Sequence, residues 1–474
     1  MSKPKSARRT ISLLVGPALF ILCIFILPRQ IFDTFEARAA VGTVAWMAYW
    51  WVTAPVDYAV TALLPIAVNA VFSITGMGAV IANYSSETIL LLLGASILTA
   101  SWEITGLDRR IASAFLGLIG TSLGGQIIFW FLLSTLMSAV LPNAVVCATI
   151  TPIAAAMLRY VGVEDVGRSE AGSMILMTVA WGAGMGGLAS PLGGAMNLVV
   201  VDYLEELIGT EYMYSDWVVK YLPVMLLLIG SNILYLLCVK PKNVRLEGSK
   251  EYFRKMQADM GKMSRQEVVC LLLFCVAAIL AFTRSLYSSL LPDLKPAYAF
   301  IICAILAFLV REDDGKPVMR WKVAEGKIVW SLIYLFAGGL AAGTLLTGSG
   351  ADQCIGNLVS ELGLSEGFFM ILIIVGFTII LSDLTSNTAT AAVAIPIVIS
   401  ITKGMGLDPV PYVFIANIGV NLSYTLPTSV RSIPVGYGMK PSYMFKHGVL
   451  LSLIVTLLMS AEAYLLLRMG WFNL

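Results

Sequence analysis

Two short polar segments interrupt long apolar stretches of this sequence, and their side chains are of the types that bind small ions. The first segment reads Pro142-Asn143-Ala144 and the second reads Thr385-Ser386-Asn387-Thr388. Hydroxyl and amide groups donate hydrogen bonds to an anion, and helix N-termini add free N–H groups and a positive dipole end. The oxygen atoms of the same groups suit a hard cation. Both segments are therefore candidate ion-binding sites.

The two segments belong to one pattern of residues that occurs twice in the chain. Matching residues are 244 positions apart at every point of the pattern. The pairs are Ser138 and Ser382, Asn143 and Asn387, Pro152 and Pro396, Gly94 and Gly338, Gly106 and Gly350, and Asp108 and Asp352. Six matches at one offset indicate an internal duplication. The alternative is that membrane helices simply reuse Gly, Asn and Pro.

The elements that position these segments are membrane helices, because the composition excludes the other common classes of protein. Of the 474 residues, 58% are hydrophobic and 13% are charged, whereas soluble domains are about 25% charged. The same hydrophobicity excludes a disordered chain, and a net charge of +2 provides no basic field for nucleic acid. Seven cysteines without CxxC spacing favour apolar packing over a disulfide framework or a zinc site.

Eleven apolar stretches approach the length of about 20 residues that a membrane-spanning helix needs. They comprise residues 11–28, 39–54, 58–77, 87–105, 172–201, 219–238, 268–283, 296–310, 328–349, 411–437 and 448–468. The sequence therefore predicts an all-α polytopic membrane protein.

Two further apolar regions, 125–160 and 366–403, are each divided near the middle by one of the polar segments. The arms on either side are too short to cross a bilayer alone. Non-helical backbone at that depth is tolerated only where it is buried in protein or lines a wet cavity. We therefore predict two re-entrant helical hairpins with polar tips. The alternative is a pair of kinked helices that cross the membrane.

The distribution of Lys and Arg predicts the orientation of the chain. Eleven spans with a cytoplasmic N-terminus place 23 of the 31 basic residues inside and 7 outside, and leave Arg431 within an apolar span. This distribution satisfies the positive-inside rule. The C-terminus then lies outside and the hairpins open to opposite sides, which makes the duplication an inverted repeat. Inverted repeats with broken helices are typical of secondary transporters.

The predicted organisation has four parts. They are an N-terminal tail with the first helix (1–38), a first repeat (39–238), a basic cytoplasmic loop (239–267) and a second repeat (268–474). The basic loop either sets the topology or lies as an amphipathic helix on anionic lipid.

Motifs between about residue 40 and the C-terminus occur in the order found in one known family. They are Trp46-Met-Ala-Tyr-Trp50-Trp51-Val-Thr53, Val60-Thr61-Ala62-Leu-Leu-Pro65, Gly106-Leu-Asp-Arg109-Arg110-Ile111-Ala112, Gly186-Gly187-Leu-Ala-Ser190-Pro191-Leu-Gly193 and Thr385-Ser386-Asn387-Thr388-Ala389-Thr390. The chain thereby resembles the divalent-anion:sodium symporter family, whose members carry dicarboxylates, citrate or sulfate. The resemblance implies a homodimer, an elevator motion of a transport domain against a scaffold, and Na+ as the coupling ion. It also implies a sodium site at each tip and a substrate carboxylate that contacts both tips.

Two sets of candidate site residues follow from the side chains and the resemblance together. The predicted substrate-binding set is Asn143, Ser386, Asn387, Thr388, Thr428 and Arg431. The predicted cation-binding set is Ser138, Asn143, Gly193, Ser382, Ser386 and Asn387. The alternative for a single Ser or Thr in a membrane helix is a hydrogen bond to its own backbone.

The chain departs from the family at two places that bear on these sets. The first tip retains Asn143 but has Pro142 and Ala144 where the family has hydroxyls, so the first cation site has one side-chain ligand fewer. Arg431 stands where the family usually has Pro, although an arginine in mid-membrane costs about 2.5–3.5 kcal/mol on insertion scales. We expect Arg431 either to pair with a substrate carboxylate or to replace one sodium ion. The alternatives are that it reaches the cytoplasmic interface or pairs with Asp383.

The sequence therefore predicts a secondary active transporter of small anions, of the dicarboxylate, tricarboxylate or sulfate class, driven by sodium. It is not expected to be an enzyme, and it contains no GxxxxGK[ST] motif that would indicate an ATP-driven pump. We expect it to lie in the lipid bilayer of a bacterial inner membrane. The alternatives are a sodium-independent anion exchanger on the same fold, an anion channel, or a sensor that does not transport.

Overall fold

The computed structural model describes residues 3–116, 119–311, 315–361 and 366–474, which form helices without a β-strand among them. Eight described helical segments are long and apolar enough to cross a membrane, and four apolar helical segments are shorter. The long ones are Arg9–Ile26, Met77–Thr105, Asn143–Tyr160, Glu170–Ala189, Tyr214–Val239, Arg265–Phe282, Trp330–Gly348 and Pro441–Arg468. The short ones are Tyr58–Phe72, Leu123–Ser138, Pro296–Ala307 and Phe368–Leu384. The all-α membrane fold is confirmed, while the count of eleven spans and the two re-entrant hairpins stay predictions.

The N-terminal helices pack against a helix of the second half of the chain. They are α1 (Lys3–Ile26), α2 (Phe35–Thr53), α3 (Tyr58–Thr61), α4 (Leu64–Phe72) and α5 (Met77–Ala82). The predicted span 58–77 is thus divided into short helices. Gly338 of α18 (Trp330–Gly348) meets Ala62 so closely that a Cβ on the glycine would lie 2.6 Å from the Ala62 Cα. Residues 1–2 of the predicted N-terminal tail lie outside the described residues.

The predicted first repeat contains two interrupted apolar regions. After α2 to α5, its helices are α6 (Glu87–Thr105), α7 (Leu107–Leu116), α8 (Leu123–Ser138), α9 (Asn143–Tyr160), α10 (Glu170–Gly186), α11 (Ala195–Ile208) and α12 (Tyr214–Val239). Region 125–160 forms α8 and α9, joined at the first polar segment. The predicted span 172–201 is broken between α10 and α11 by two short 3₁₀ turns, Gly187–Ala189 and Pro191–Gly193.

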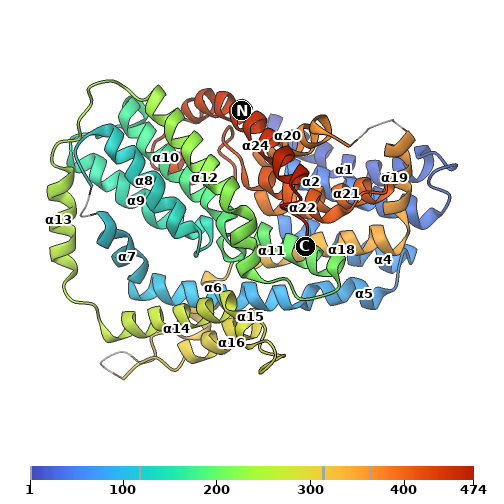
Figure 1. The fold of residues 1–474 in the computed structure, drawn as a ribbon, viewed down its shortest axis with the longest axis horizontal. Helices are drawn as coiled ribbons and strands as arrows, with labels where there is room; N and C mark the ends of the chain where they lie inside the picture. Colours follow the sequence, from blue (N-terminus) through green and yellow to red (C-terminus); the bar gives the residue numbers. More distant parts are fainter. Residues whose placement is uncertain (1–2, 117–118, 312–314, 362–365) are drawn as a thin grey trace.

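The predicted second repeat has helices that begin 244 residues later, to within one residue, from α6 to α9. They are α18, α19 (Ala351–Glu361), α20 (Phe368–Leu384), α21 (Asn387–Gly404), α22 (Pro409–Asn421), α23 (Ser432–Gly436) and α24 (Pro441–Arg468). The predicted span 411–437 is broken after α22, as 172–201 is broken after α10. The pair α8 and α9 lies in one half of the molecule, and α20 and α21 lie in the other (Figure 1). The inverted relation of the two halves and the division into four parts stay predictions.

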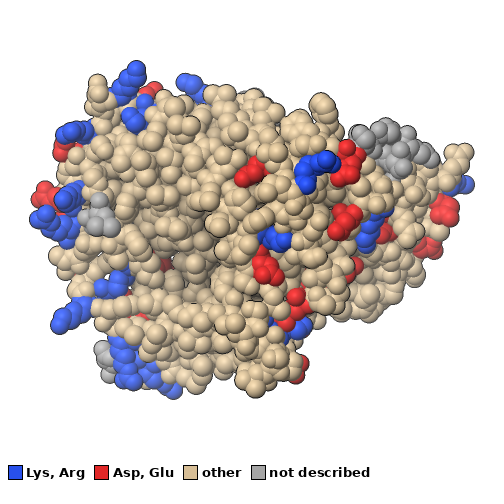
Figure 2. All heavy atoms as spheres, in the orientation of Figure 1, with Lys and Arg blue, Asp and Glu red and all other residues tan. Residues whose placement is uncertain are grey.

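The predicted basic loop contains a helix that packs on α8. The helices between α12 and α18 are α13 (Ser249–Met260), α14 (Arg265–Phe282), α15 (Arg284–Tyr287), α16 (Pro296–Ala307) and α17 (Trp321–Lys327), of which α14 to α17 fall in the predicted second repeat. Phe253 of α13 is buried against the ring of Trp130 on α8, and Gln126 Nε2 donates to Ser249 Oγ at 2.9 Å. Lys and Arg side chains gather over the end of the molecule that carries α13 (Figure 2). The apolar side of this helix therefore contacts protein, while its basic side chains remain on the surface.

Glycines allow α8 to approach α10, the first part of the broken helix that follows it. Gly182 and Gly186 of α10 face α8, where a Cβ would lie 2.7 Å from the Phe131 carbonyl oxygen and 2.6 Å from the Thr135 Cα. Larger residues would separate the two helices. This close packing brings the tip between α8 and α9 next to the break between α10 and α11.

Candidate ion and substrate site

The second tip is a short non-helical link in which hydroxyl groups hold the backbone. Ser386 begins α21 as its N-cap, and its Oγ accepts from the Ala389 N–H at 3.1 Å. Thr385 Oγ1 donates to the Leu381 carbonyl at 2.8 Å and lies 2.9 Å from Thr390 Oγ1. The free N-terminus of α21 therefore points at the tip, which is the arrangement that favours a bound anion.

The end of α22 and the segment that follows it contact this tip through several hydrogen bonds. Ser382 Oγ donates to the Val420 carbonyl at 2.7 Å. Asn387 Nδ2 donates to the Asn421 carbonyl at 3.5 Å, and its Oδ1 accepts from Ser423 Oγ at 3.3 Å. Thr428 Oγ1 donates to the backbone carbonyl of Asp383 at 3.1 Å. The structure thus brings together the predicted residues Ser382, Ser386, Asn387 and Thr428.

Arg431 lies inside this assembly, with only 2% of its surface exposed. Its Nε donates to the Leu426 carbonyl at 2.9 Å, and Nη1 donates to the Ser423 carbonyl at 3.2 Å and to Ser423 Oγ. Nη2 donates to the Ser382 carbonyl at 3.3 Å and to Thr428 Oγ1 at 2.6 Å. Asp383 is not among these partners, because its Oδ1 accepts from the backbone N–H groups of residues 424 and 425. Arg431 therefore neither reaches an interface nor pairs with Asp383.

The first tip repeats part of this geometry. Ser138 Oγ donates to the Ala183 carbonyl at 2.7 Å, as Ser382 does to Val420. Gly193 packs so closely that a Cβ on it would lie 2.5 Å from the Ser138 carbonyl oxygen. Asn143 begins α9 beside Gly194, since its Nδ2 would be 3.9 Å from a Cβ at that position. The predicted residues Ser138, Asn143 and Gly193 thus lie next to one break.

Three asparagines join the two broken helices. Asn197 Nδ2 donates to the carbonyls of residues 187 and 190 at 2.6 and 2.9 Å, which holds the first break. Its Oδ1 accepts from Asn421 Nδ2 at 2.9 Å and from Asn417 Nδ2 at 3.4 Å. The sequence analysis did not single out Asn417 and Asn421. Two asparagines one turn apart in an apolar helix are a signal that could have identified them.

The comparison with known proteins gives the family. The model of one family, described as citrate transporter, matches residues 48–419, which include both tips and the first break. The chain belongs to the citrate transporter family. This membership confirms a membrane transporter and not an enzyme, and it agrees with the resemblance to divalent-anion:sodium symporters.

Curated relatives and one solved structure are similar to this citrate transporter family member over most of its length. A protein named sodium-dependent dicarboxylate transporter SdcS from Staphylococcus saprophyticus is 25% identical over 456 residues, which cover 92% of this chain and 86% of the relative. The Staphylococcus aureus protein of the same name is 25% identical over 452 residues, with the same coverage. The crystal structure of the Alcanivorax borkumensis YdaH transporter has a TM-score of 0.55, with 12% identity, and covers 83% of this chain and 88% of that one. This last likeness concerns the fold alone.

Two predicted substrate-binding residues of this citrate transporter family member have polar side-chain groups without a hydrogen-bond partner among the described residues. In the described part of the chain, neither the Asn143 amide nor the Thr388 hydroxyl makes a side-chain hydrogen bond. Asn143 belongs to the first tip, at the start of α9, and Thr388 belongs to the second tip, at the start of α21. The tips also approach the same element, because Cys147 of α9 lies 3.6 Å from the Val430 carbonyl, next to Arg431. Accessible polar groups without a protein partner, at two helix starts, are suited to an anion that bridges them.

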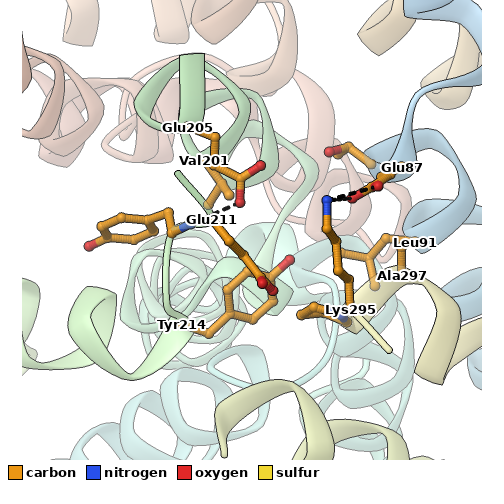
Figure 3. Close-up of a pocket in the computed structure, with 11 residues that line it drawn as sticks. Glu87, Leu91, Val201, Glu205, Glu211, Tyr214, Lys295 and Ala297 are labelled. Carbon is orange, nitrogen blue, oxygen red and sulfur yellow. Dashed lines mark hydrogen bonds and ion pairs between the residues drawn. The ribbon is translucent and has the colours of Figure 1, made fainter. Parts of the chain in front are cut away.

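A polar pocket lies away from the tips, between the start of α6, α11 and the start of α16 (Figure 3). Lys295 Nζ donates to both carboxylate oxygens of Glu87 at 2.9 and 3.0 Å. Beside the pocket, Arg284 Nε donates to both oxygens of Glu211 at 2.9 and 3.1 Å, and these hydrogen bonds raise the pKa of the Arg284 side chain. These charged side chains are paired with each other, and the pairs connect the ends of neighbouring helices. We therefore assign the pocket no substrate.

Proposed function

We propose that this chain is a sodium-coupled secondary transporter of dicarboxylates that works by an elevator-type motion. The observation that carries the proposal is the meeting of two polar hairpin tips with two broken helices that contact each other through Asn197 and Asn421. Such sites supply neutral donors and backbone carbonyls together, which suit an anion and a hard cation at one place. The names of the Staphylococcus relatives support both the dicarboxylate and the sodium ion.

We assign the roles according to the hydrogen bonds that each side chain already makes within the protein. The unsatisfied Asn143 and Thr388 side chains hold the carboxylates of the substrate, together with Ser386, Asn387 and Thr428. Ser138, Asn143 and Gly193 surround a cation at the first tip, where backbone carbonyls converge on the glycine. Ser382, Ser386 and Asn387 form the corresponding place at the second tip. The pseudo-equivalent hydrogen bonds of Ser138 and Ser382 support this assignment.

The proposal includes the setting of the transporter in the membrane. The chain lies in a bacterial inner membrane as a homodimer, with a cytoplasmic N-terminus and an external C-terminus. The gathering of Lys and Arg side chains at the α13 end supports a cytoplasmic location for that end. The hairpins then enter from opposite sides, as their positions in opposite halves of the molecule suggest (Figure 1).

Uptake into proteoliposomes tests the proposal. The purified full chain is reconstituted, and uptake of labelled succinate is measured with and without an inward sodium gradient, with malate, citrate, sulfate and lactate as competitors. We expect accumulation of succinate that requires the gradient and stops when a sodium ionophore dissipates it. Competition by malate but not by lactate is expected, because two carboxylates are needed to engage both tips. Uptake that requires an internal anion, or flux driven by voltage alone, would contradict sodium symport.

The variant Thr388→Val tests the proposed substrate site. A hydrogen bond to a charged group contributes about 1.5–3 kcal/mol, so we expect the KM for succinate to rise about tenfold or more. The control is Thr456→Val on α24, where the hydroxyl donates to its own helix at the Ser452 carbonyl. An unchanged KM in the first variant would remove Thr388 from the site.

A sodium-independent anion exchanger is the second candidate, and one observation favours it. The buried Arg431 guanidinium supplies a permanent positive charge at the second tip. A charge of this kind can balance an anion without a sodium ion. In the same assay, an exchanger would show uptake only when the vesicles contain a counter-anion.

A further inference from the structure

The described hydrogen-bond partners of the Arg431 guanidinium are all oxygen atoms that carry no formal charge. Its five described hydrogen bonds end on the carbonyls of Ser382, Ser423 and Leu426 and on the hydroxyls of Ser423 and Thr428. A buried arginine is expected to pair with a carboxylate, yet Asp383 is engaged by backbone N–H groups instead. The environment of this side chain is therefore the kind that surrounds a hard cation and not the kind that forms an ion pair.

The same oxygen atoms belong to the place predicted for a cation at the second tip. Ser382 is in the predicted cation set, and Ser423 Oγ also donates to Asn387 Oδ1, which is in that set as well. A guanidinium has five N–H donors and stays protonated in proteins. Each of the three nitrogens is engaged here, so no N–H remains unengaged for a substrate carboxylate in this conformation. The positive charge is thus already coordinated by protein.

The first tip differs at the corresponding break. Residues 187–194 read Gly-Leu-Ala-Ser-Pro-Leu-Gly-Gly and contain no Lys or Arg. The Ser138 carbonyl points at Gly193, and the Asn143 side chain has no hydrogen-bond partner among the described residues. The oxygen atoms of the first tip are therefore available to a mobile ion, while those of the second tip are taken.

We propose that the Arg431 guanidinium is the permanent cation of the second tip, so that only the first tip takes up a free sodium ion. This inference rests on the proposed function, because it concerns the number of coupling ions. The bound anion then experiences one fixed and one exchangeable positive charge. Fewer sodium ions per cycle give a smaller maximum accumulation, since each ion multiplies the attainable ratio by its own gradient.

Sodium stoichiometry in the wild-type chain and in Arg431→Gln tests the inference. Glutamine keeps a polar side chain but removes the charge, which leaves the second tip open to sodium. In proteoliposomes we expect the ratio of sodium to succinate, measured from the reversal of flux at opposed gradients, to be one higher in the variant. We also expect a higher Hill coefficient for sodium in Arg431→Gln than in wild type. Arg468→Gln, at the exposed end of α24, is the matched control and should behave as wild type. Equal ratios in wild type and Arg431→Gln would overturn the inference.

A binding measurement separates this inference from the proposed function. Thermal unfolding of the purified chain is followed in sodium chloride and in choline chloride. Arg431→Gln should gain additional stabilisation by sodium, and millimolar methylguanidinium should stabilise the variant but not the wild-type chain. If wild type transports only by exchange, the proposed symport fails while this binding result still supports the inference. If neither sodium nor methylguanidinium stabilises Arg431→Gln beyond wild type, the inference is wrong. Arg431→Lys, which keeps the charge, should not gain the sodium effect, and a gain there would also overturn it.

Discussion

Asn421→Ala is the change that tests whether the two halves of the transporter are joined at the broken helices. Asn421 Nδ2 donates to Asn197 Oδ1 at 2.9 Å and to the carbonyl and Oδ1 of Asn417, both at 3.0 Å. The first of these bonds connects the break after α10 with the end of α22. After truncation, Asn197 Oδ1 keeps only the contact of 3.4 Å with Asn417.

The expected loss of stability depends on the hydrogen bonds and the unsatisfied polar atom that the substitution removes. A buried polar atom left without a partner costs about 1–3 kcal/mol, but polar contacts between membrane helices average about 0.6 kcal/mol and reach about 1.7 kcal/mol. Asn421 Oδ1 is buried and has no partner in the described structure, so truncation also removes an unsatisfied acceptor. We therefore expect Asn421→Ala to lower the free energy of unfolding by about 1 kcal/mol.

A double-mutant cycle provides the assay. The wild-type chain, Asn421→Ala, Asn197→Ala and the double variant are unfolded with SDS in mixed micelles and followed by circular dichroism. A coupling of about 0.6–1.7 kcal/mol is expected for the direct bond. Asn473→Ala, near the exposed C-terminus, serves as the control and should leave the transition unchanged. A coupling within the error of additivity, about 0.3–0.5 kcal/mol, would refute the bridge between the halves.

Three further changes have expected outcomes that follow from packing and pairing. Gly186→Ala places a Cβ 2.6 Å from the Thr135 Cα, so we expect a loss of about 1–3 kcal/mol in the same unfolding assay and impaired transport. Arg284→Ala removes the guanidinium whose Nε donates to both oxygens of Glu211, and because the Glu211 side chain is 18% exposed we expect a loss of about 1–3 kcal/mol, with partial recovery in Arg284→Lys. Phe253→Ala empties the contact between α13 and α8, and limited proteolysis should then cleave region 239–267 faster than in wild type. Unchanged cleavage rates would show that α13 is held by its polar contacts instead.

The helix boundaries at the tips could be predicted from the sequence because they depend on local chemistry. Asn143 and Asn387 each lie in a polar segment that divides an apolar region, and each begins a helix in the structure. The breaks within 172–201 and 411–437 were not visible as interruptions of hydropathy. Gly, Ser and Pro are common in membrane helices, because neighbouring helices satisfy the freed backbone groups. Only the motif at 186–193, carried by the family resemblance, pointed to the first of these breaks.

The partners of Arg431 could not be predicted from the sequence, because they are mostly backbone carbonyls. A sequence shows which side chains are charged, and it therefore suggested Asp383 or a substrate carboxylate as the partner. The extended segment after α22 exposes the carbonyls of Ser423 and Leu426, which the guanidinium binds instead. The bond between Asn197 and Asn421 was hidden for a related reason, because it joins residues that lie far apart in the chain and in different repeats.

Substitution of the serine at each tip distinguishes its effect on stability from its effect on sodium binding. Ser138 and Ser382 each donate at 2.7 Å to a carbonyl of the neighbouring broken helix, Ala183 or Val420. Replacing either by Ala removes one such bond, so both variants should lose about 1 kcal/mol of stability. Their effects on sodium should differ, because the Ser382 carbonyl already accepts from Arg431 while the first tip has no such side chain at its break.

We therefore expect Ser138→Ala to raise the sodium concentration for half-maximal uptake several-fold or more, because the cation loses a hydroxyl or the carbonyl that this hydroxyl positions. Ser382→Ala should leave that concentration near the wild-type value, since no mobile sodium ion binds there. Initial rates of succinate uptake at varied sodium measure both variants against wild type, and unfolding in SDS confirms that their stabilities match. Equal shifts in the two variants would mean that both tips bind mobile sodium, and Arg431 would then have to act on the substrate and not in place of an ion.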